Sequence, residues 1–309
     1  MADHLQAGDW PQFLGPHRTG VSSESGLISA FPADGPVVLW RKPLGTGMSG
    51  IAVVGETAFT MYQNAEHQLV VALNAQTGKT LWETPVAPPY ENAMGNGPRA
   101  TPTVADGSVF VYTGEGILAK LSAENGKVQW SHNVPQELNG PPSEYGMACS
   151  PLVIGSTVIV QSGTKSAAVA AFDAVSGNRK WTAGTGTAGY SSPVLMTLAG
   201  KPQVVAFAGA AALGIAPDDG RVLWDFPFET DYDCNTATPV QLSDSTLLIS
   251  SGENHGSAVL SVTANGDRFS VTTGWTSFGP KSVLRAEWQT PALTNGYLFG
   301  LDNIGSAGL

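Results

Sequence analysis

The chain has 309 residues and a formal net charge of −10, from 25 acidic and 15 basic side chains. This charge disfavours binding to nucleic acid, whose phosphates need Lys and Arg, and binding to anionic membrane surfaces. Charged residues make up only 13% of the chain, while Gly and Pro number 37 and 21, a composition typical of an all-β protein with many turns.

The first 36 residues carry no repeat and are expected to form an N-terminal arm. The segment 9–27, DWPQFLGPHRTGVSSESGL, is rich in Pro, Gly and Ser and predicts an ordered arm across one face or the side of the following domain. Residues 1–10 lack the basic and apolar regions of a signal peptide, so the protein is either cytoplasmic or has lost an export signal. Residues 37–44, VVLWRKPL, predict a lone outer strand that ends near Trp40.

An eleven-residue motif then recurs along the chain. It reads ALNAQTGKTLW at 72–82 and returns at 120–130, 171–181 and 214–224, with a degraded copy at 260–270. Its glycine predicts a tight turn with positive φ, and the Trp that ends four of the copies predicts a wedge between neighbouring sheets. The glycines lie 43 to 51 residues apart and are Gly78, Gly126, Gly177, Gly220 and Gly266.

A Ser-Pro or Thr-Pro pair keeps the same period, with its first residue at Thr101, Ser150, Ser192, Thr238 and Thr290. Pro fits the first residue of a strand, and two further strand-like runs separate each pair from the next glycine motif. Four short antiparallel strands per unit of about 40–50 residues are typical of a β-propeller blade. Residues 37–309 therefore predict a β-propeller, with blades at about 49–86, 98–138, 148–185, 190–229 and 236–275 and a partial blade at 288–309.

The partial blade holds only two strands. We therefore expect a propeller truncated at its C-terminus, with about five full blades. The lone strand at 37–44 is expected to complete the last blade of the full ring.

The pattern A-x-D-A-x-[TSN]-G-x-x-x-W, as in AFDAVSGNRKW at 171–181, follows a Ser/Thr-Pro pair and resembles the pyrroloquinoline-quinone (PQQ)-like repeat. The resemblance covers about residues 37–309, and five copies keep phase. It implies an eight-bladed propeller of the quinoprotein alcohol dehydrogenase type, in the periplasm or outside the cell. The family includes quinoprotein dehydrogenases and BamB-like scaffolds of outer-membrane protein assembly.

The sequence lacks the cofactor site that the resemblance implies for a dehydrogenase, namely a vicinal disulfide, a calcium site and a catalytic Asp. Cys149 and Cys234 lie far apart, and we expect two buried thiols in preference to a disulfide. The stretch DYDCN at 231–235 resembles the start of a calcium loop, but Thr236 replaces the required Gly. The five His show no metal-ligand spacing. We expect no catalytic residue, no metal and no cofactor, with PQQ and calcium as the disfavoured alternative.

The segments before the Ser/Thr-Pro pairs are rich in polar and aromatic residues. They lead into the innermost strands, so we expect them to ring one mouth of the central channel, where a rigid scaffold places functional side chains. They contribute Arg99, Tyr145, Tyr190, Asn235 and Glu287. These side chains either hold a small polar ligand, a peptide or a protein partner, or bind one another and cap the channel.

Two functions follow from these observations. The favoured one is a non-enzymatic module of the cell envelope that binds a ligand or protein, or serves as a scaffold. The alternative is a PQQ-dependent oxidoreductase of the dehydrogenase type. No nucleic-acid partner and no transmembrane segment are expected.

Overall fold

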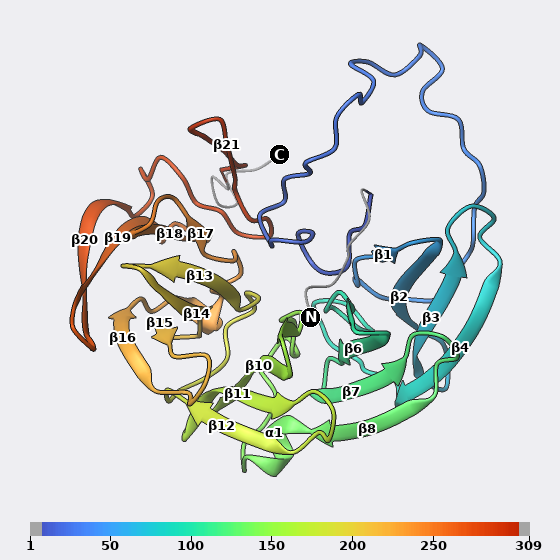
Figure 1. Ribbon diagram of the computed structural model, residues 1–309, viewed down its shortest axis with the longest axis horizontal. Helices are drawn as coiled ribbons and strands as arrows, with labels where there is room; N and C mark the ends of the chain where they lie inside the picture. The colour runs from blue at the N-terminus through green and yellow to red at the C-terminus, as the bar shows by residue number, and fades with distance from the viewer. Residues whose placement is uncertain (1–7, 303–309) are drawn as a thin grey trace.

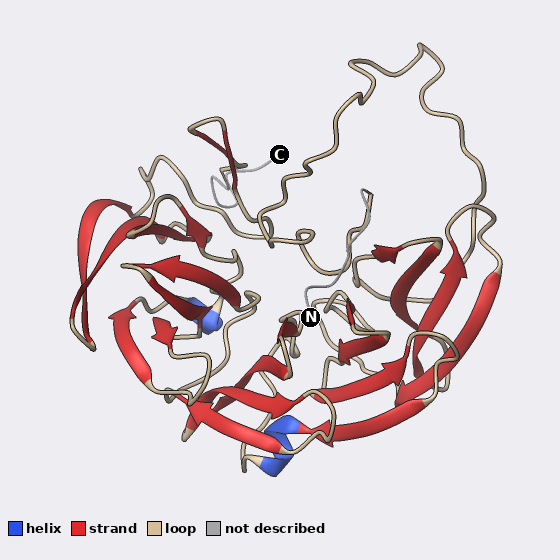
Figure 2. Ribbon diagram, viewed as in Figure 1, coloured by secondary structure: helices blue, strands red, loops and turns tan. Residues whose placement is uncertain are grey.

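The computed structural model describes residues 8–302 and consists almost entirely of antiparallel β-strands. Five four-stranded sheets and one two-stranded sheet follow one another along the chain, each formed by consecutive strands. Figures 1 and 2 show these sheets arranged as an arc around a common centre. The predicted β-propeller of four-stranded blades is confirmed. The last residues of the expected partial blade, 303–309, and the first residues of the arm, 1–7, lie outside the described part.

The blades have the following strands. Blade 1 contains β1 (Ala52–Val54), β2 (Thr57–Gln63), β3 (Gln68–Asn74) and β4 (Thr80–Ala87). Blade 2 contains β5 (Thr103–Ala105), β6 (Ser108–Tyr112), β7 (Ile117–Ser122) and β8 (Val128–Asn133), followed by a short helix, α1 (Val134–Glu137). Blade 3 contains β9 (Leu152–Ile154), β10 (Thr157–Thr164), β11 (Ala167–Asp173) and β12 (Arg179–Ala183).

Blade 4 contains β13 (Val194–Leu198), β14 (Lys201–Phe207), β15 (Ala211–Ile215) and β16 (Val222–Pro227). A 3₁₀ turn, η1 (Asp231–Asp233), leads to blade 5, which contains β17 (Val240–Gln241), β18 (Thr246–Ser251), β19 (Gly256–Asn265) and β20 (Arg268–Phe278). The two-stranded sheet contains β21 (Ala292–Thr294) and β22 (Tyr297–Phe299). Within residues 8–302, no helix has the length and apolar character needed to cross a bilayer.

The core lies between the blades. All five residues of β6 are buried, whereas β4 alternates between half-buried and exposed positions. Middle strands pack against a neighbouring blade on each face, which is why they are continuous apolar runs, and outer strands face solvent on one side. Phe110 of blade 2 and Phe172 of blade 3, for example, share one buried cluster.

The Trp and Gly of the eleven-residue motif contact each other across neighbouring blades. The Nε1–H of Trp82 in blade 1 donates to the carbonyl oxygen of Ala123 in blade 2, at 2.9 Å. Its ring covers Gly126, where an added Cβ would come within 2.5 Å of ring atom Cε3. The same contact joins Trp40 to Gly78, Trp130 to Gly177 and Trp181 to Gly220. The predicted wedges are therefore present, and the glycines serve this close approach as well as a positive φ.

The contact is absent at the degraded copy of the motif. Trp224 donates its Nε1–H to Oε1 of Gln203 in its own blade, at 2.6 Å, and nothing described lies within 4 Å of a Cβ added to Gly266. At the other end, Trp40 donates to the carbonyl of Ala75 at 2.9 Å. The expected strand at 37–44 is not formed, because these residues pair with no strand within residues 8–302.

The Ser/Thr hydroxyls before the prolines link consecutive blades near the channel. The backbone N–H of Ser150 donates to Oγ of Ser192 at 2.9 Å, and the N–H of Ser192 donates to Oγ1 of Thr238 at 3.3 Å. The relay begins with the N–H of Thr101 donating to Ser150 and ends with that of Thr238 donating to Thr290, both at 3.0 Å. The sequence pattern explained only the proline of each pair, as the first residue of a strand. The structure shows that the hydroxyl of the preceding Ser or Thr joins neighbouring blades.

Substitution of Ser192 by alanine is expected to lower the free energy of unfolding by about 1–3 kcal/mol, because the buried N–H of Ser150 loses its acceptor. Ser192→Thr keeps the hydroxyl and should stay close to the wild type. Urea unfolding followed by circular dichroism measures both variants. Equal stability of the alanine and threonine variants would contradict a structural role for the relay.

The N-terminal arm enters the central channel, and its expected position across a face or the side is wrong for residues 10–18. Trp10 forms an antiparallel bridge with Val53 of β1. Arg18 is 4% exposed, and its guanidinium donates to the carbonyl oxygens of Ser150, Pro151 and Pro193. These carbonyls belong to the segments that open blades 3 and 4, and the five N–H donors of one guanidinium can satisfy all three of them together. Burial lowers the pKa of Arg18 to about 9, so the side chain is charged at neutral pH.

Candidate functional site

A cavity of about 390 Å³ lies at the mouth of the channel, where the segments before the inner strands meet. Its wall follows a rule: the residue two positions before each Ser/Thr-Pro pair faces the channel. Blade 1 obeys the same rule, with Gly50-Ile51 in place of the pair. These residues are Met48, Arg99, Ala148, Tyr190, Thr236 and Trp288, and Phe13, Met94 and Tyr145 complete the lining.

The alternation of an extended backbone explains this rule. Successive side chains of an extended segment point to opposite sides, so residues two apart face the same way. The first residues of three pairs, Thr101, Ser150 and Ser192, accordingly line a deeper hollow of about 370 Å³ that shares Arg99 and Tyr190 with the mouth cavity. Residues three positions before a pair turn away from the channel.

The arm closes the inner end of this hollow. Trp10, Gln12, Phe13 and Leu14 line it opposite the inner strands, and Phe13 also lines the mouth cavity. Arg18 fastens the arm beyond them. The wall of the hollow is therefore formed jointly by the arm and by the segments that lead into the inner strands.

Arg99 is the only charged side chain of the described part that lines the mouth cavity. Its guanidinium lies 4.8 Å from the centre of the Tyr90 ring and donates to the carbonyls of Gly97 at 2.6 Å and Gly95 at 2.7 Å. Burial lowers the pKa of Arg99, and the neighbouring Tyr90 and Tyr190 act in the opposite direction. With two of its five donors occupied, the side chain is held in place and can still donate to a ligand.

Three tyrosines form a cluster at the mouth. The rings of Tyr145 and Tyr190 stack with centroids 5.9 Å apart, and Tyr232 is tilted against Tyr145 at 6.1 Å. The N–H of Tyr145 donates to the hydroxyl of Tyr190 at 3.3 Å. Burial raises the pKa of Tyr145 and Tyr190, so both hydroxyls stay protonated at neutral pH.

The other two residues expected at the mouth do not line the cavity. Asn235 is fully buried, and its Nδ2 donates to the carbonyls of Ala208 at 2.8 Å and of Gly209 and Phe228 at 3.1 Å. Glu287 is 7% exposed, and burial followed by the nearby charge of Glu253 raises its pKa. Both lie three positions before a pair, next to a residue that lines the cavity and on the other side of the extended segment. The structure therefore brings together Arg99, Tyr145 and Tyr190 only.

The lining residues that sequence reasoning missed are Met48, Met94, Ala148, Trp288, Thr236 and Phe13. The first blade lacks the Ser/Thr-Pro pair. Met48 could have been found only by treating Gly50 as the equivalent of Thr101, because Met48 lies two positions before it. Trp288 and Thr236 could have been found by strict alternation, since each lies next to an expected residue. Phe13 had no signal in the sequence, because its position depends on the path of the arm.

The described residues do not fit a calcium-bound quinone. No Asp, Glu or His of residues 8–302 lines either part of the hollow, and no group of three or more His, Cys, Asp or Glu side chains within this range could hold a metal ion. The stretch 231–235 forms the 3₁₀ turn η1 and the residues after it. Cys149 and Cys234 are buried free thiols, as expected, and burial raises the pKa of each to about 12.

Comparisons with known proteins agree with this fold. The profile of the family described as outer membrane protein assembly factor BamB matches residues 24–145 and 69–303. The chain is 30% identical over 140 residues to the outer membrane protein assembly factor BamB of Yersinia pestis, a match that covers 41% of this chain and 34% of that protein. For the BamB of Moranella endobia (strain PCIT) the figures are 28% over 153 residues, 45% of this chain and 37% of that protein. The matches thus span about a third of the curated relatives' length.

Solved structures with the same fold include both classes of the family. BamB from Moraxella catarrhalis superposes with a TM-score of 0.61 at 15% identity, covering 88% of this chain and 75% of that one. Quinohemoprotein alcohol dehydrogenase from Comamonas testosteroni superposes with a TM-score of 0.57 at 17% identity, covering 97% and 53%. These likenesses concern the fold alone. Since the family profile extends over most of its length, the chain belongs to the BamB-like family of PQQ-like repeat propellers.

Proposed function

We propose that the chain is a non-enzymatic binding module of the cell envelope, which acts as a scaffold in protein assembly and binds a segment of a partner protein at the mouth of its channel. The relatives are named outer membrane protein assembly factors, which supports the envelope and the assembly role. The observation that carries the proposal is the cavity at the mouth, to which the segment before each blade contributes at least one side chain.

The chemistry of the wall suits a peptide side chain. Met48, Met94, Tyr190 and Trp288 present apolar and aromatic surface, and Arg99 offers directed donors. Aromatic residues, Met and Arg are the types enriched where proteins bind each other, and Met adapts to side chains of different shape. A volume of about 390 Å³ accommodates one or two large side chains.

Photo-crosslinking in intact cells tests this proposal. A benzoylphenylalanine at Met94 or at Trp288, which are 52% and 65% exposed in the cavity wall, is expected to give a discrete adduct. The same group at Val175, which is 75% exposed in the β11–β12 turn, serves as the control. Tyr190→Ala should abolish the adduct at Met94. Equal adducts at all three positions, or none in the cavity, would contradict the proposal.

The second candidate is a PQQ-dependent oxidoreductase, favoured by the aromatic wall and by a fold shared with a quinohemoprotein dehydrogenase. The described donor set does not fit this role, so no catalytic step is assigned. Titration with PQQ and calcium tests it, because Trp10 and Trp288 line the hollow and should be quenched by a bound quinone. Saturable quenching with dye reduction by alcohols would favour this candidate over the scaffold.

A further inference from the structure

Four carboxylates cluster beside the tyrosines at the rim of the mouth. Glu144 precedes blade 3, Asp233 precedes blade 5, Glu253 lies in the β18–β19 turn and Glu287 precedes β21. The hydroxyl of Ser251 donates to the carbonyl of Cys234 at 2.7 Å, and a Cβ added to Gly252 would lie 2.3 Å from the Cβ of Glu287. The β18–β19 turn therefore lies beside the residues after η1 and beside the segment before β21. All four carboxylates raise the pKa of the Cys234 thiol. None of them has an ion-pair partner within 4.0 Å in the described part of the chain.

The buried basic side chain at this edge, Arg285, is already engaged by a carboxylate of the chain. Arg285 donates from Nη2 and Nε to the two carboxylate oxygens of Asp302, at 2.7 and 3.0 Å, and from Nη1 to Asn254 and Pro280. It is 4% exposed. The rim is therefore left with an excess of negative charge.

Glu287 supplies the second observation that indicates a ligand. Its side chain is 93% buried, and its Oε2 has no hydrogen-bond partner among the described residues. The carboxylate lies against the turn at Gly252, where an added Cβ would be 2.5 Å from Oε2. A buried carboxylate oxygen without a partner is costly, and native structures normally provide a donor or a cation for it.

The tyrosine cluster supplies the third observation. Tyr232 and Asp233 both have φ of +58°, a conformation that costs a non-glycine residue free energy, and the resulting loop places the Tyr232 ring against Tyr145. Tyr232 is 62% exposed. The faces of aromatic rings attract guanidinium and ammonium groups within about 6 Å.

We infer that this rim, formed by Tyr145, Tyr190, Tyr232 and the four carboxylates, binds a Lys or Arg side chain of the partner segment. The inference rests on the proposed function, since the cavity beside the rim takes an apolar side chain of the same segment. The carboxylates of the described residues are not grouped closely enough to ligate a metal ion, whereas aromatic faces beside carboxylates suit a large organic cation.

Fluorescence anisotropy with two labelled octapeptides tests the inference. One peptide alternates Leu and Arg, and the other replaces each Arg by citrulline, which has nearly the same shape and no charge. At low salt the Arg peptide is expected to bind about tenfold more tightly than the citrulline peptide, the size that one partly desolvated charge pair with a ring contact supplies.

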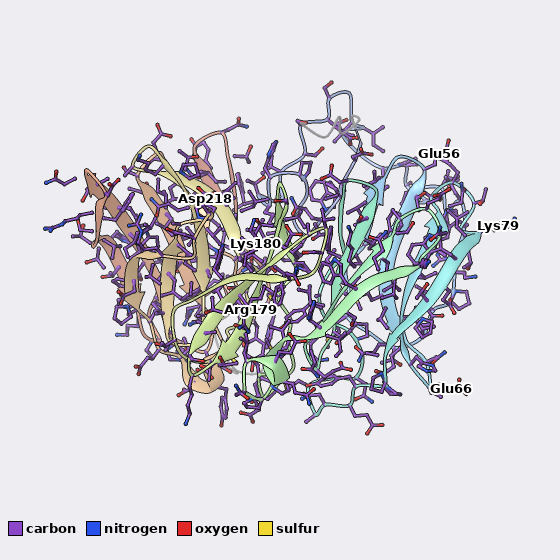
Figure 3. All side chains as sticks on the ribbon, turned by 60° about the horizontal axis from the view of Figure 1, so that its bottom comes forward. Glu56, Glu66, Lys79, Arg179, Lys180 and Asp218 are labelled. Atoms are coloured by element: carbon purple, nitrogen blue, oxygen red, sulfur yellow. The ribbon has the colours of Figure 1, made fainter. Side chains whose placement is uncertain are left out.

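Two double variants provide the matched comparison. Asp233→Asn with Glu253→Gln removes two charges from the rim and should weaken binding of the Arg peptide about tenfold, with the citrulline peptide unaffected. Glu56→Gln with Asp218→Asn removes the same charge from exposed positions in the β1–β2 and β15–β16 turns. Figure 3 shows the labelled Glu56 and Asp218 at the face opposite Glu66, which lies in the β2–β3 turn. Because neither residue lines the cavity, binding should not change. Tyr145→Leu should weaken the Arg peptide three- to tenfold.

The outcomes separate the inference from the proposed function. Equal binding of the two peptides, or equal weakening by both double variants, would overturn the basic side chain as the ligand. If neither peptide binds while the crosslinks at Met94 and Trp288 persist, the inference fails and the scaffold stands. If neither peptide binds and no crosslink forms at Met94 or Trp288, both the inference and the proposed function fail.

Discussion

Replacing Gly126 by alanine is expected to lower the free energy of unfolding by about 2–5 kcal/mol. Gly126 has φ of +72°, which costs an alanine about 1–2 kcal/mol. The added methyl would also lie 2.5 Å from Cε3 of Trp82 and 2.6 Å from Oγ1 of Thr84. Overpacking of this kind costs about 1–3 kcal/mol.

The Trp82 ring cannot move aside without a further loss. Its Nε1–H donates a hydrogen bond to the carbonyl of Ala123, so a shift of the ring would break this hydrogen bond between blades 1 and 2. Thr84 is similarly fixed, since its hydroxyl donates to the carbonyl of Gly126 at 2.8 Å. The methyl group therefore affects the interface between two blades as well as one turn.

The chain contains its own control for this substitution. Gly266 occupies the same place in the degraded copy of the motif and has φ of +61°, with nothing described within 4 Å of an added Cβ. Gly266→Ala should cost only the conformational part, about 1–2 kcal/mol. Urea unfolding of both variants measures the difference. Equal destabilisation would mean that the ring contact contributes nothing and that the positive φ alone explains why each copy of the motif has a glycine.

The propeller could be predicted because its repeats carry local signals. A glycine at a turn, a Trp four residues later and a proline at a strand start each have a physical reason that acts within one blade, and repetition makes the pattern visible. The contacts that join blades could not be read in this way. The hydroxyl of Ser192 and the carbonyl of Ala123 meet their partners more than 40 residues away, and no local pattern states which atoms face each other.

The site shows the same division. Arg99 and Tyr190 were found because they stand two positions before a marker. Asn235 and Glu287 stand one position further back, and the alternation of an extended segment turns them away from the cavity wall. Phe13 lines the cavity because the arm enters the channel, where the Arg18 guanidinium donates to carbonyls more than 130 residues away in the sequence.

Substitution of Arg18 by methionine is expected to release the arm from the channel and to lower the free energy of unfolding by roughly 2–4 kcal/mol. Methionine keeps an unbranched apolar side chain but leaves the buried carbonyls of Ser150, Pro151 and Pro193 without their donor. Hydrogen bonds to a charged group contribute about 1.5–3 kcal/mol each, and relief from burying the guanidinium offsets part of the loss.

Hydrogen exchange measures the release directly. In the wild type the N–H of Trp10 donates to Val53 at 2.7 Å and that of Gly20 donates to Leu14 at 2.9 Å, so both amides should be protected. In Arg18→Met they should exchange at least tenfold faster, the change that corresponds to a loss of about 1.4 kcal/mol. His17→Ala alters the exposed neighbour and should leave the protection intact. Unchanged protection in Arg18→Met would show that the apolar contacts of Trp10 and Phe13 hold the arm without the guanidinium.

The same variant connects the arm to the binding site. Phe13 forms part of the cavity wall, so release of the arm would open the inner end of the pocket and remove one apolar contact with a bound side chain. Arg18→Met should therefore weaken binding of both the Arg and the citrulline octapeptide by a similar factor, because the lost contact is apolar. A loss confined to the Arg peptide would instead place the arm's contribution in the electrostatics of the rim, which the position of Arg18 deep in the channel argues against.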